Sequence, residues 1–133
     1  AILLEQAAMR HIEKHGWPQA MEGGWSIGSD GQLDLLPVLA SLDQAVDADQ
    51  AAARFHATLA AALGEWVAQA AQVGALRTAA WGGGCFLNAL LCARLRHDLE
   101  RRGIAVLAPA RLSPGDAGIA LGQAWVAMNS MER

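Results

Sequence analysis

β-branched residues are scarce in this chain, which has 6 Val, 5 Ile and 2 Thr among its 133 residues. Such residues are enriched in strands, so their scarcity argues against an all-β sandwich or barrel. Alanine and leucine dominate instead, with 29 and 18 copies. Because alanine is the strongest helix former, the composition predicts a fold in which helices predominate.

A strong charge of either sign is also missing. The formal net charge is −3 and the pI is about 5.7, which gives no long-range electrostatic reason to expect a nucleic-acid partner. Charged residues make up 17% of the chain and hydrophobic residues 53%, which excludes an intrinsically disordered protein. A mass of 14.0 kDa suffices for one small domain with its own hydrophobic core.

Long apolar runs and paired cysteines are lacking as well. The longest uncharged stretch, residues 78–93, is shorter than the roughly 20 residues that a membrane span needs. The first residues lack the charged-then-apolar pattern of a signal peptide. Cys85 and Cys92 fall in one expected helix, about 10 Å apart, too far for a disulfide. Two unpaired thiols are typical of a reducing compartment, so we expect a cytoplasmic domain without a membrane partner.

Helical patterns dominate the first half of the chain. Residues 1–15 predict a helix that ends at Gly16. Residues 23–34 contain turn residues that predict a hairpin, and residues 35–42 predict a short helix. Residues 47–73 predict a long amphipathic helix. Its expected buried stripe consists of Phe55, Leu59, Leu63, Trp66, Ala70 and Val73.

The second half alternates between strand and helix. Residues 76–81 and 104–108 are short apolar runs bounded by Gly or Pro, and we expect both to be buried strands. Residues 86–102 between them predict a helix whose apolar face is formed by Leu87, Leu91, Leu95 and Leu99. A last helix is expected over residues 114–128. A strand–helix–strand unit of this kind implies a parallel pair with a right-handed crossover, so the predicted class is α/β.

Two short segments are candidates for chemistry. Gly82, Gly83 and Gly84 lie between an expected strand and an expected helix, where they either form a simple tight turn or let the backbone approach a phosphate. Asp116 either completes a capping box with Ser113 or acts as a hard metal ligand at the end of a strand. Spacing alone does not decide between these alternatives.

Other polar residues have plainer interpretations. His11 and His15 are four residues apart and could form half of a metal site, but two exposed histidines on a helix explain them better. Cys85 could be an activated thiol at a helix N-terminus, although no motif supplies a base and we expect a buried structural thiol. The four arginines between residues 94 and 102 are interpreted as a solvated helix face.

The segments WGGGCFLN (residues 81–88) and PGDAGIALGQ (residues 114–123) together resemble the C-terminal end of HypF, the hydrogenase maturation carbamoyltransferase family. That family shows an SGGVFQN stretch, a leucine-rich helix, a short strand and then PPNDGGIALGQ. The resemblance is close in order and spacing over residues 76–127. It is weaker upstream, around residues 6–9 and 53–56.

The resemblance implies the C-terminal lobe of an actin-like, Kae1-like ATP-binding fold, helix-rich with a small sheet. In that family the glycine turn and its Asn contact nucleotide, which implies that Gly83, Gly84 and Asn88 bind ATP. The Asp of the second motif holds a metal near the phosphates together with upstream histidines. This implies that Asp116 is a ligand of a divalent metal or of iron in the full-length enzyme, and that Mg accompanies the ATP. No residue is assigned a catalytic role.

The implied activity is that of a larger enzyme. The family uses carbamoyl phosphate and ATP to carbamoylate the C-terminal cysteine of a HypE acceptor protein, for the cyanide ligand of [NiFe] hydrogenase. Its members carry further domains upstream, so we expect residues 1–133 to be one domain and a fragment that is inactive alone. The alternative is a degenerate, non-catalytic interaction module with the same fold. Departures from the family pattern at Leu4, Gly82 and Leu87 motivate that alternative.

Overall fold

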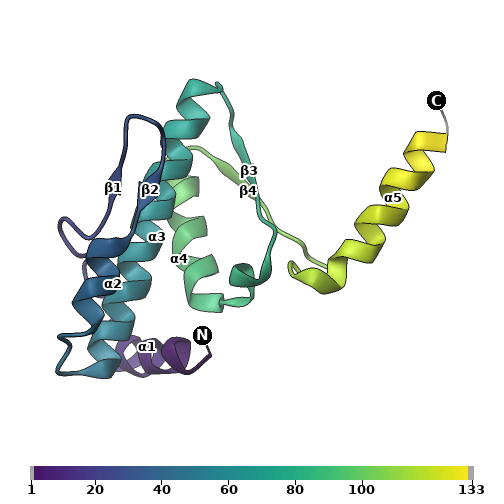
Figure 1. Ribbon diagram of the computed structural model, residues 1–133. Coiled ribbons are helices and arrows are strands. Elements are labelled where there is room, and N and C mark those ends of the chain that lie inside the picture. Colours follow the sequence, from purple (N-terminus) through teal and green to yellow (C-terminus); the bar gives the residue numbers. More distant parts are fainter. Residues whose placement is uncertain (1, 132–133) are drawn as a thin grey trace.

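The computed structural model describes residues 2–131, which form a helical body with two small sheets and a separate C-terminal helix (Figure 1). The first half contains the helices α1 (Ile2–His15), α2 (Leu36–Leu42) and α3 (Ala48–Val73), with the strands β1 (Ser26–Ile27) and β2 (Leu33–Asp34). The second half contains β3 (Thr78–Ala80), α4 (Ala89–Arg101), β4 (Ala105–Leu107) and α5 (Ile119–Met131), with 3₁₀ turns η1 (Gly84–Leu87) and η2 (Asp116–Gly118). All the helices and strands expected from the sequence are present, with shifted ends.

The long helix α3 is the centre of the body and packs against both α1 and α4. Part of the predicted stripe is confirmed, because Leu59 and Leu63 pack against the core. Its later part was wrong: Trp66 is 40% exposed and Val73 is 93% exposed. Small residues form the contacts instead, among them Ala52, Ala53, Ala57, Ala60 and Gly64. Two neighbouring helices approach α3 closely only where its side chains are small, so the larger apolar residues lie at the margins of these contacts.

The leucine row of α4 builds the other half of the core. Leu91, Leu95 and Leu99 are buried, as predicted, and pack with Trp81 and Ile104. Leu87 was wrongly placed in this row, since it is 64% exposed. The reason is local: residues 84–87 form a 3₁₀ turn and the α-helix begins only after Asn88, so the four-residue spacing does not continue back to Leu87.

β3 and β4 pair in parallel, with Thr78 opposite Ala105 and Ala80 opposite Leu107, as expected for the strand–helix–strand unit. The expectation that both strands are buried was wrong. The middle residues, Ala79 and Val106, pack against the helical core, whereas the residues on either side are exposed. Successive side chains of a strand point to opposite faces, so the helical core covers only one face of this sheet.

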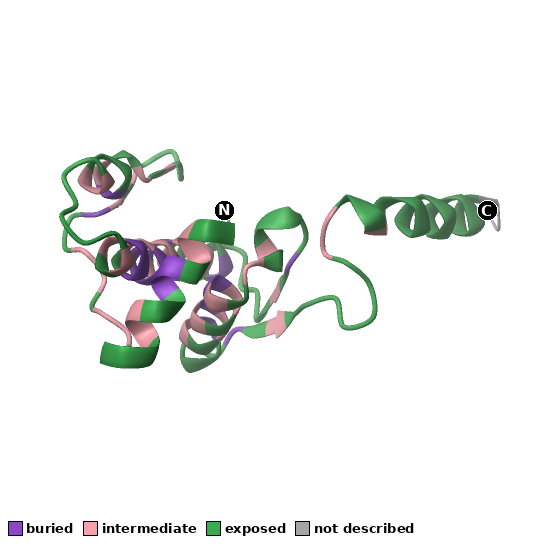
Figure 2. Cartoon of the chain, turned by 90° about the horizontal axis from the view of Figure 1, so that it is seen from below, coloured by how far each residue is buried: buried purple, intermediate pink, exposed green. Residues whose placement is uncertain are grey.

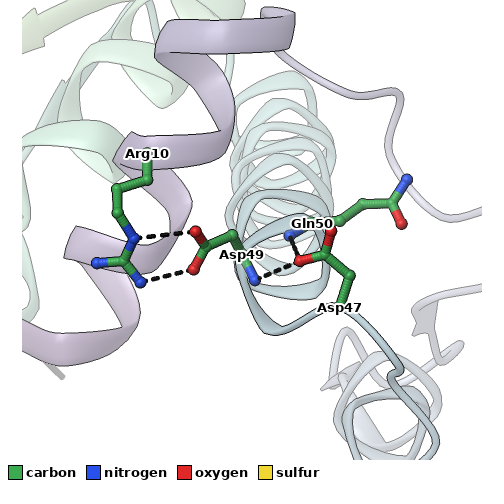
Figure 3. Close-up of polar contacts among 4 residues, drawn as sticks. All are labelled: Arg10, Asp47, Asp49 and Gln50. Atoms are coloured by element: carbon green, nitrogen blue, oxygen red, sulfur yellow. Dashed lines mark hydrogen bonds and ion pairs between the residues drawn. The ribbon is translucent and has the colours of Figure 1, made fainter.

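The hairpin and the first helix are both anchored on α3. β1 pairs with β2 in antiparallel fashion, and the Trp66 indole N–H donates to the Gly31 carbonyl in the hairpin turn at 2.7 Å. Arg10 of α1 forms two hydrogen bonds with the Asp49 carboxylate, at 2.6 and 2.9 Å (Figure 3). The hydrogen bond from Arg10 lowers the pKa of Asp49, and the same bond raises the pKa of Arg10. Asp47 caps α3 by accepting from the amides of Asp49 and Gln50.

The last helix stands apart from the body. All described residues of α5 are exposed, and the segment is uniformly coloured as exposed in Figure 2. The capping box, one of the two alternatives for Asp116, is not formed: Gly115, not Ser113, precedes the 3₁₀ turn, and the Ser113 hydroxyl accepts from the Gly115 amide at 3.2 Å. Across residues 2–131, no helix combines the length and apolarity that crossing a membrane requires.

Candidate functional site

The glycine turn follows β3 directly and depends on glycine at one position. Gly83 has φ 109° and ψ 157°, a backbone region that is essentially restricted to glycine. In this conformation its amide donates to the Pro114 carbonyl at 2.6 Å. The turn is therefore tied to a segment that lies about thirty residues further along the chain.

The two motifs of the sequence meet at this hydrogen bond. Gly115 lies beside the turn, since a Cβ there would be in ordinary van der Waals contact with the Gly84 Cα at 3.7 Å. Asp116 follows immediately and is exposed, as are Gly83 and Gly84. β3 and β4 are parallel, so the segments that leave their carboxyl ends emerge at one edge of the sheet. Ligand sites of α/β proteins lie at such edges.

Stacked side chains hold the turn against the body. The rings of Trp81 and Phe86 stack with their centroids 4.9 Å apart, and the Arg96 guanidinium lies 5.2 Å from the centre of the Trp81 ring. Trp81 is buried, and its amide donates to the Leu107 carbonyl at 2.9 Å, next to the last pair of the ladder. Trp81 before the glycines and Phe86 after them thus fix the position of the turn.

Asn88 is the N-cap residue of α4. Its Oδ1 accepts from the Leu91 amide at 2.8 Å, and its Nδ2 lies 2.9 Å from Nε2 of the buried His56. The Glu5 carboxylate from α1 accepts from the next amides, Ala89 at 2.7 Å and Leu90 at 3.4 Å. The first amides of α4 are therefore already bound by protein groups.

Because these α4 amides are already hydrogen-bonded, other backbone amides would have to donate to a bound phosphate. The sequence suggested the N-terminus of the helix after the glycines, but Glu5 and Asn88 fill that terminus in the structure. Among the described residues, the amides of Gly84 and Cys85 have no hydrogen-bond acceptor. Both residues are exposed. Together with the Gly82 amide, which also has no acceptor among residues 2–131, they are the free donors of the turn.

Glu5 and His56 were not identified as site residues from the sequence. His56 lies among alanines on the buried face of α3 and is only 2% exposed, and an isolated histidine in such a pattern is usually a core residue. Both residues lie in or beside the upstream segments whose resemblance was noted above, around residues 6–9 and 53–56. That resemblance was the available signal, but it assigned no role to either side chain.

The two cysteines differ from expectation. Cys85 is exposed at the turn, so the prediction of a buried thiol was wrong; the glycines before it keep the segment on the surface. Both thiols are free, as predicted. Cys92 is half-buried and donates to the Phe86 carbonyl at 3.2 Å, and burial is the main cause that raises the pKa of its thiol.

A metal site confined to the described residues is absent. Residues 2–131 contain no group of three or more His, Cys, Asp or Glu side chains able to hold an ion. The rings of His11 and His15 lie 4.9 Å apart, without a third ligand. Asp116 offers one hard carboxylate, and among the described residues this carboxylate has no hydrogen-bond or ion-pair partner. It fits a metal as a single ligand, with the others supplied from elsewhere.

Comparison with known proteins now gives these features a context. Residues 1–123 match the family model described as the second subdomain of the carbamoyltransferase Kae1-like domain. The chain is 48% identical over 109 residues to carbamoyltransferase HypF2 of Cupriavidus necator, covering 82% of this chain. The chain belongs to the HypF family.

Other HypF proteins agree. Identity is 45% over 133 residues to a carbamoyltransferase HypF homolog of Cupriavidus necator and 44% over 122 residues to carbamoyltransferase HypF of Rhizobium leguminosarum. These matches cover 96% and 89% of the chain but only 34% and 16% of the relatives, and the HypF2 match covers 14% of that protein. The chain thus spans a minor part of its curated HypF relatives.

A solved HypF structure has the same fold. The crystal structure of full-length HypF in the phosphate- and nucleotide-bound form matches 86% of this chain with a TM-score of 0.73, at 22% sequence identity. The match covers 16% of that HypF chain. The helix-rich α/β arrangement with its parallel pair is therefore that of a HypF Kae1-like lobe, as the motifs had implied.

Proposed function

We propose that this chain is one lobe of a HypF-type carbamoyltransferase and contributes half of a nucleotide and metal site. The observation that supports the proposal best is the 2.6 Å hydrogen bond from the Gly83 amide to the Pro114 carbonyl. It joins two motifs that are far apart in the sequence, one with free amides and the other with a free carboxylate. The similar fold in a phosphate- and nucleotide-bound HypF is a second support.

The residues of the lobe have distinct tasks in this proposal. The amides of Gly84 and Cys85 donate to phosphate oxygens of ATP, since glycines allow the backbone to approach closely. Asp116 provides an oxygen ligand for a divalent metal or iron near the phosphates, and Mg accompanies the nucleotide. Asn88 has a second Nδ2 hydrogen beyond the one directed at His56, and we assign it to the nucleotide. A metal bound there would neutralise charge on the phosphates.

The proposed reaction requires the whole enzyme. It consumes carbamoyl phosphate and ATP, forms a carbamoyl adenylate, and transfers the carbamoyl group to the C-terminal cysteine of a HypE-like acceptor, for the cyanide ligand of a [NiFe] hydrogenase. Asp116 as a single ligand cannot assemble the metal site alone, so the remaining ligands come from upstream domains of the same enzyme.

Titration calorimetry with Mg-ATP on the longer native polypeptide that includes this lobe tests the proposal. We expect binding in the micromolar range, weakened when Mg is chelated, because a hydrolysable cosubstrate is bound and released in each cycle. The same titration in the presence of carbamoyl phosphate should show turnover heat. Absence of nucleotide binding would instead favour the non-catalytic interaction module.

The exposed helix α5 supports the view that upstream domains pack on this lobe. It contains no charged residue, and its large apolar side chains are more than half exposed, including Leu121 (55%), Trp125 (67%) and Val126 (63%). A helix that is apolar on all sides is normally buried. The curated relatives are several times longer than the chain, so they have further subdomains available to cover it.

Hydrogen exchange measured on the longer native polypeptide checks the burial of α5. We expect amides of residues 119–131 to exchange at least about a hundredfold more slowly than in the isolated chain, because packing suppresses local opening of the helix. The solvated end of α4, around Arg101, serves as the internal control and should not change. Equal exchange of α5 in both proteins would contradict its role as a docking helix.

A further inference from the structure

The buried His56 makes two hydrogen bonds, one within α3 and one to the start of α4. Its Nδ1 lies 2.8 Å from the Ala52 carbonyl, one turn earlier in its own helix. Its Nε2 lies 2.9 Å from Nδ2 of Asn88. The side chain is 2% exposed, so water does not replace either partner if it is lost.

Only one arrangement of hydrogens satisfies this network. Asn88 Oδ1 must face the Leu91 amide, because that amide is a donor and needs an acceptor. The Asn88 NH₂ group therefore faces His56 and donates to Nε2, which must be unprotonated. Since the Ala52 carbonyl can only accept, the proton of the neutral imidazole is on Nδ1.

The network controls a residue that borders the glycine turn. Asn88 ends η1 and begins α4, and its backbone amide donates to the Cys85 carbonyl at 3.2 Å. Glu5 holds the next amides of α4 from the other side. The Asn88 side chain is held at Oδ1 by the Leu91 amide and at Nδ2 by His56, whose ring is buried against α3.

We propose that His56 is a positioning residue for the nucleotide site, acting through Asn88. The inference rests on the proposed function in one respect, namely that Asn88 contacts ATP. His56 orients the Asn88 amide at the junction of η1 and α4, and it occupies one of the two Nδ2 hydrogens, which leaves the other for the nucleotide. It does not touch the nucleotide itself.

Three variants in the longer native polypeptide separate positioning from general stability. His56→Leu removes the acceptor for Asn88, whereas His56→Gln retains one in its side-chain oxygen. Thr58→Val is the matched control, because Thr58 is 0% exposed on the same helix and its hydroxyl also makes two hydrogen bonds. It donates to the Arg54 carbonyl at 2.7 Å and accepts from the Met21 amide at 2.9 Å, so neither bond involves Asn88. We expect Mg-ATP to bind about tenfold more weakly to His56→Leu and within about twofold of wild type to His56→Gln and Thr58→Val.

Hydrogen exchange without nucleotide provides the readout that does not depend on ATP. Amides of residues 84–91 should exchange faster in His56→Leu than in Thr58→Val. Equal exchange in these two variants overturns the inference even if ATP binds, and absence of ATP binding to the wild type rejects the proposed function but not the positioning.

The tautomer can be checked in the wild-type protein, so the inference does not depend on a variant that folds. ¹⁵N spectra of histidine-labelled protein should show His56 as the neutral tautomer protonated at Nδ1. A proton on Nε2 would leave the Asn88 donor facing another donor, and it would overturn the inference.

Discussion

Replacing Asp116 by Ala in the full-length enzyme is expected to reduce carbamoyl-phosphate-dependent ATP turnover about 100-fold or more, because the variant removes a metal ligand from the phosphate site. The structure offers no competing structural role for this side chain. Asp116 is exposed, and the capping box with Ser113 is not formed. The free energy of unfolding should therefore change by less than about 0.5 kcal/mol.

Asp43→Ala is the matched control for this experiment. Asp43 is also exposed, and it is the C-cap residue of α2, a helix that packs on α3. Its replacement should leave both turnover and stability unchanged. Asp116→Asn adds a second comparison, since an amide keeps the shape of the side chain but is a poorer ligand for a hard cation. Undiminished turnover in both Asp116 variants would exclude the metal role.

Local sequence patterns predicted the elements of this fold well, because strong signals coincide. The helices were indicated by alanine and leucine at helical spacing, with glycine or proline at the ends, and the strands by short apolar runs. The regular row of Leu91, Leu95 and Leu99 correctly predicted the buried face of α4. The buried face of α3 was mispredicted in part because hydrophobicity ranks Phe and Trp above Ala. Close packing against two helices instead favours small residues such as Ala53 and Ala57.

The candidate site was predictable only in part, for a related reason. The sequence predicted Gly83, Gly84 and Asp116 as site residues, because glycine clusters and acidic residues after strands are known ligand-binding patterns. The hydrogen bond that joins Gly83 to Pro114 is a tertiary contact that no local pattern encodes. The same holds for His56 and Glu5, which reach the N-terminus of α4 from two other helices.

The second substitution with a large expected effect is in the glycine turn. Gly83→Ala places a Cβ on a residue with φ 109° and ψ 157°, a conformation that costs a non-glycine residue about 1–3 kcal/mol. No atom lies within 4 Å of that Cβ, so the cost arises from the backbone and not from a clash. The turn can relieve the strain only by changing φ, and that change turns the Gly83 amide away from the Pro114 carbonyl.

We therefore expect Gly83→Ala to weaken Mg-ATP binding at least about tenfold and to lower the free energy of unfolding by about 1–3 kcal/mol, measured by calorimetry and chemical denaturation of the full-length enzyme. Gly82→Ala is a close control, because Gly82 is also exposed with open space around its Cβ, but its φ lies outside the left-handed region. Equal effects of the two substitutions would show that the turn needs small residues but not the special backbone of Gly83. A loss confined to Gly83→Ala would identify the contact between the two motifs as the structural basis of nucleotide binding.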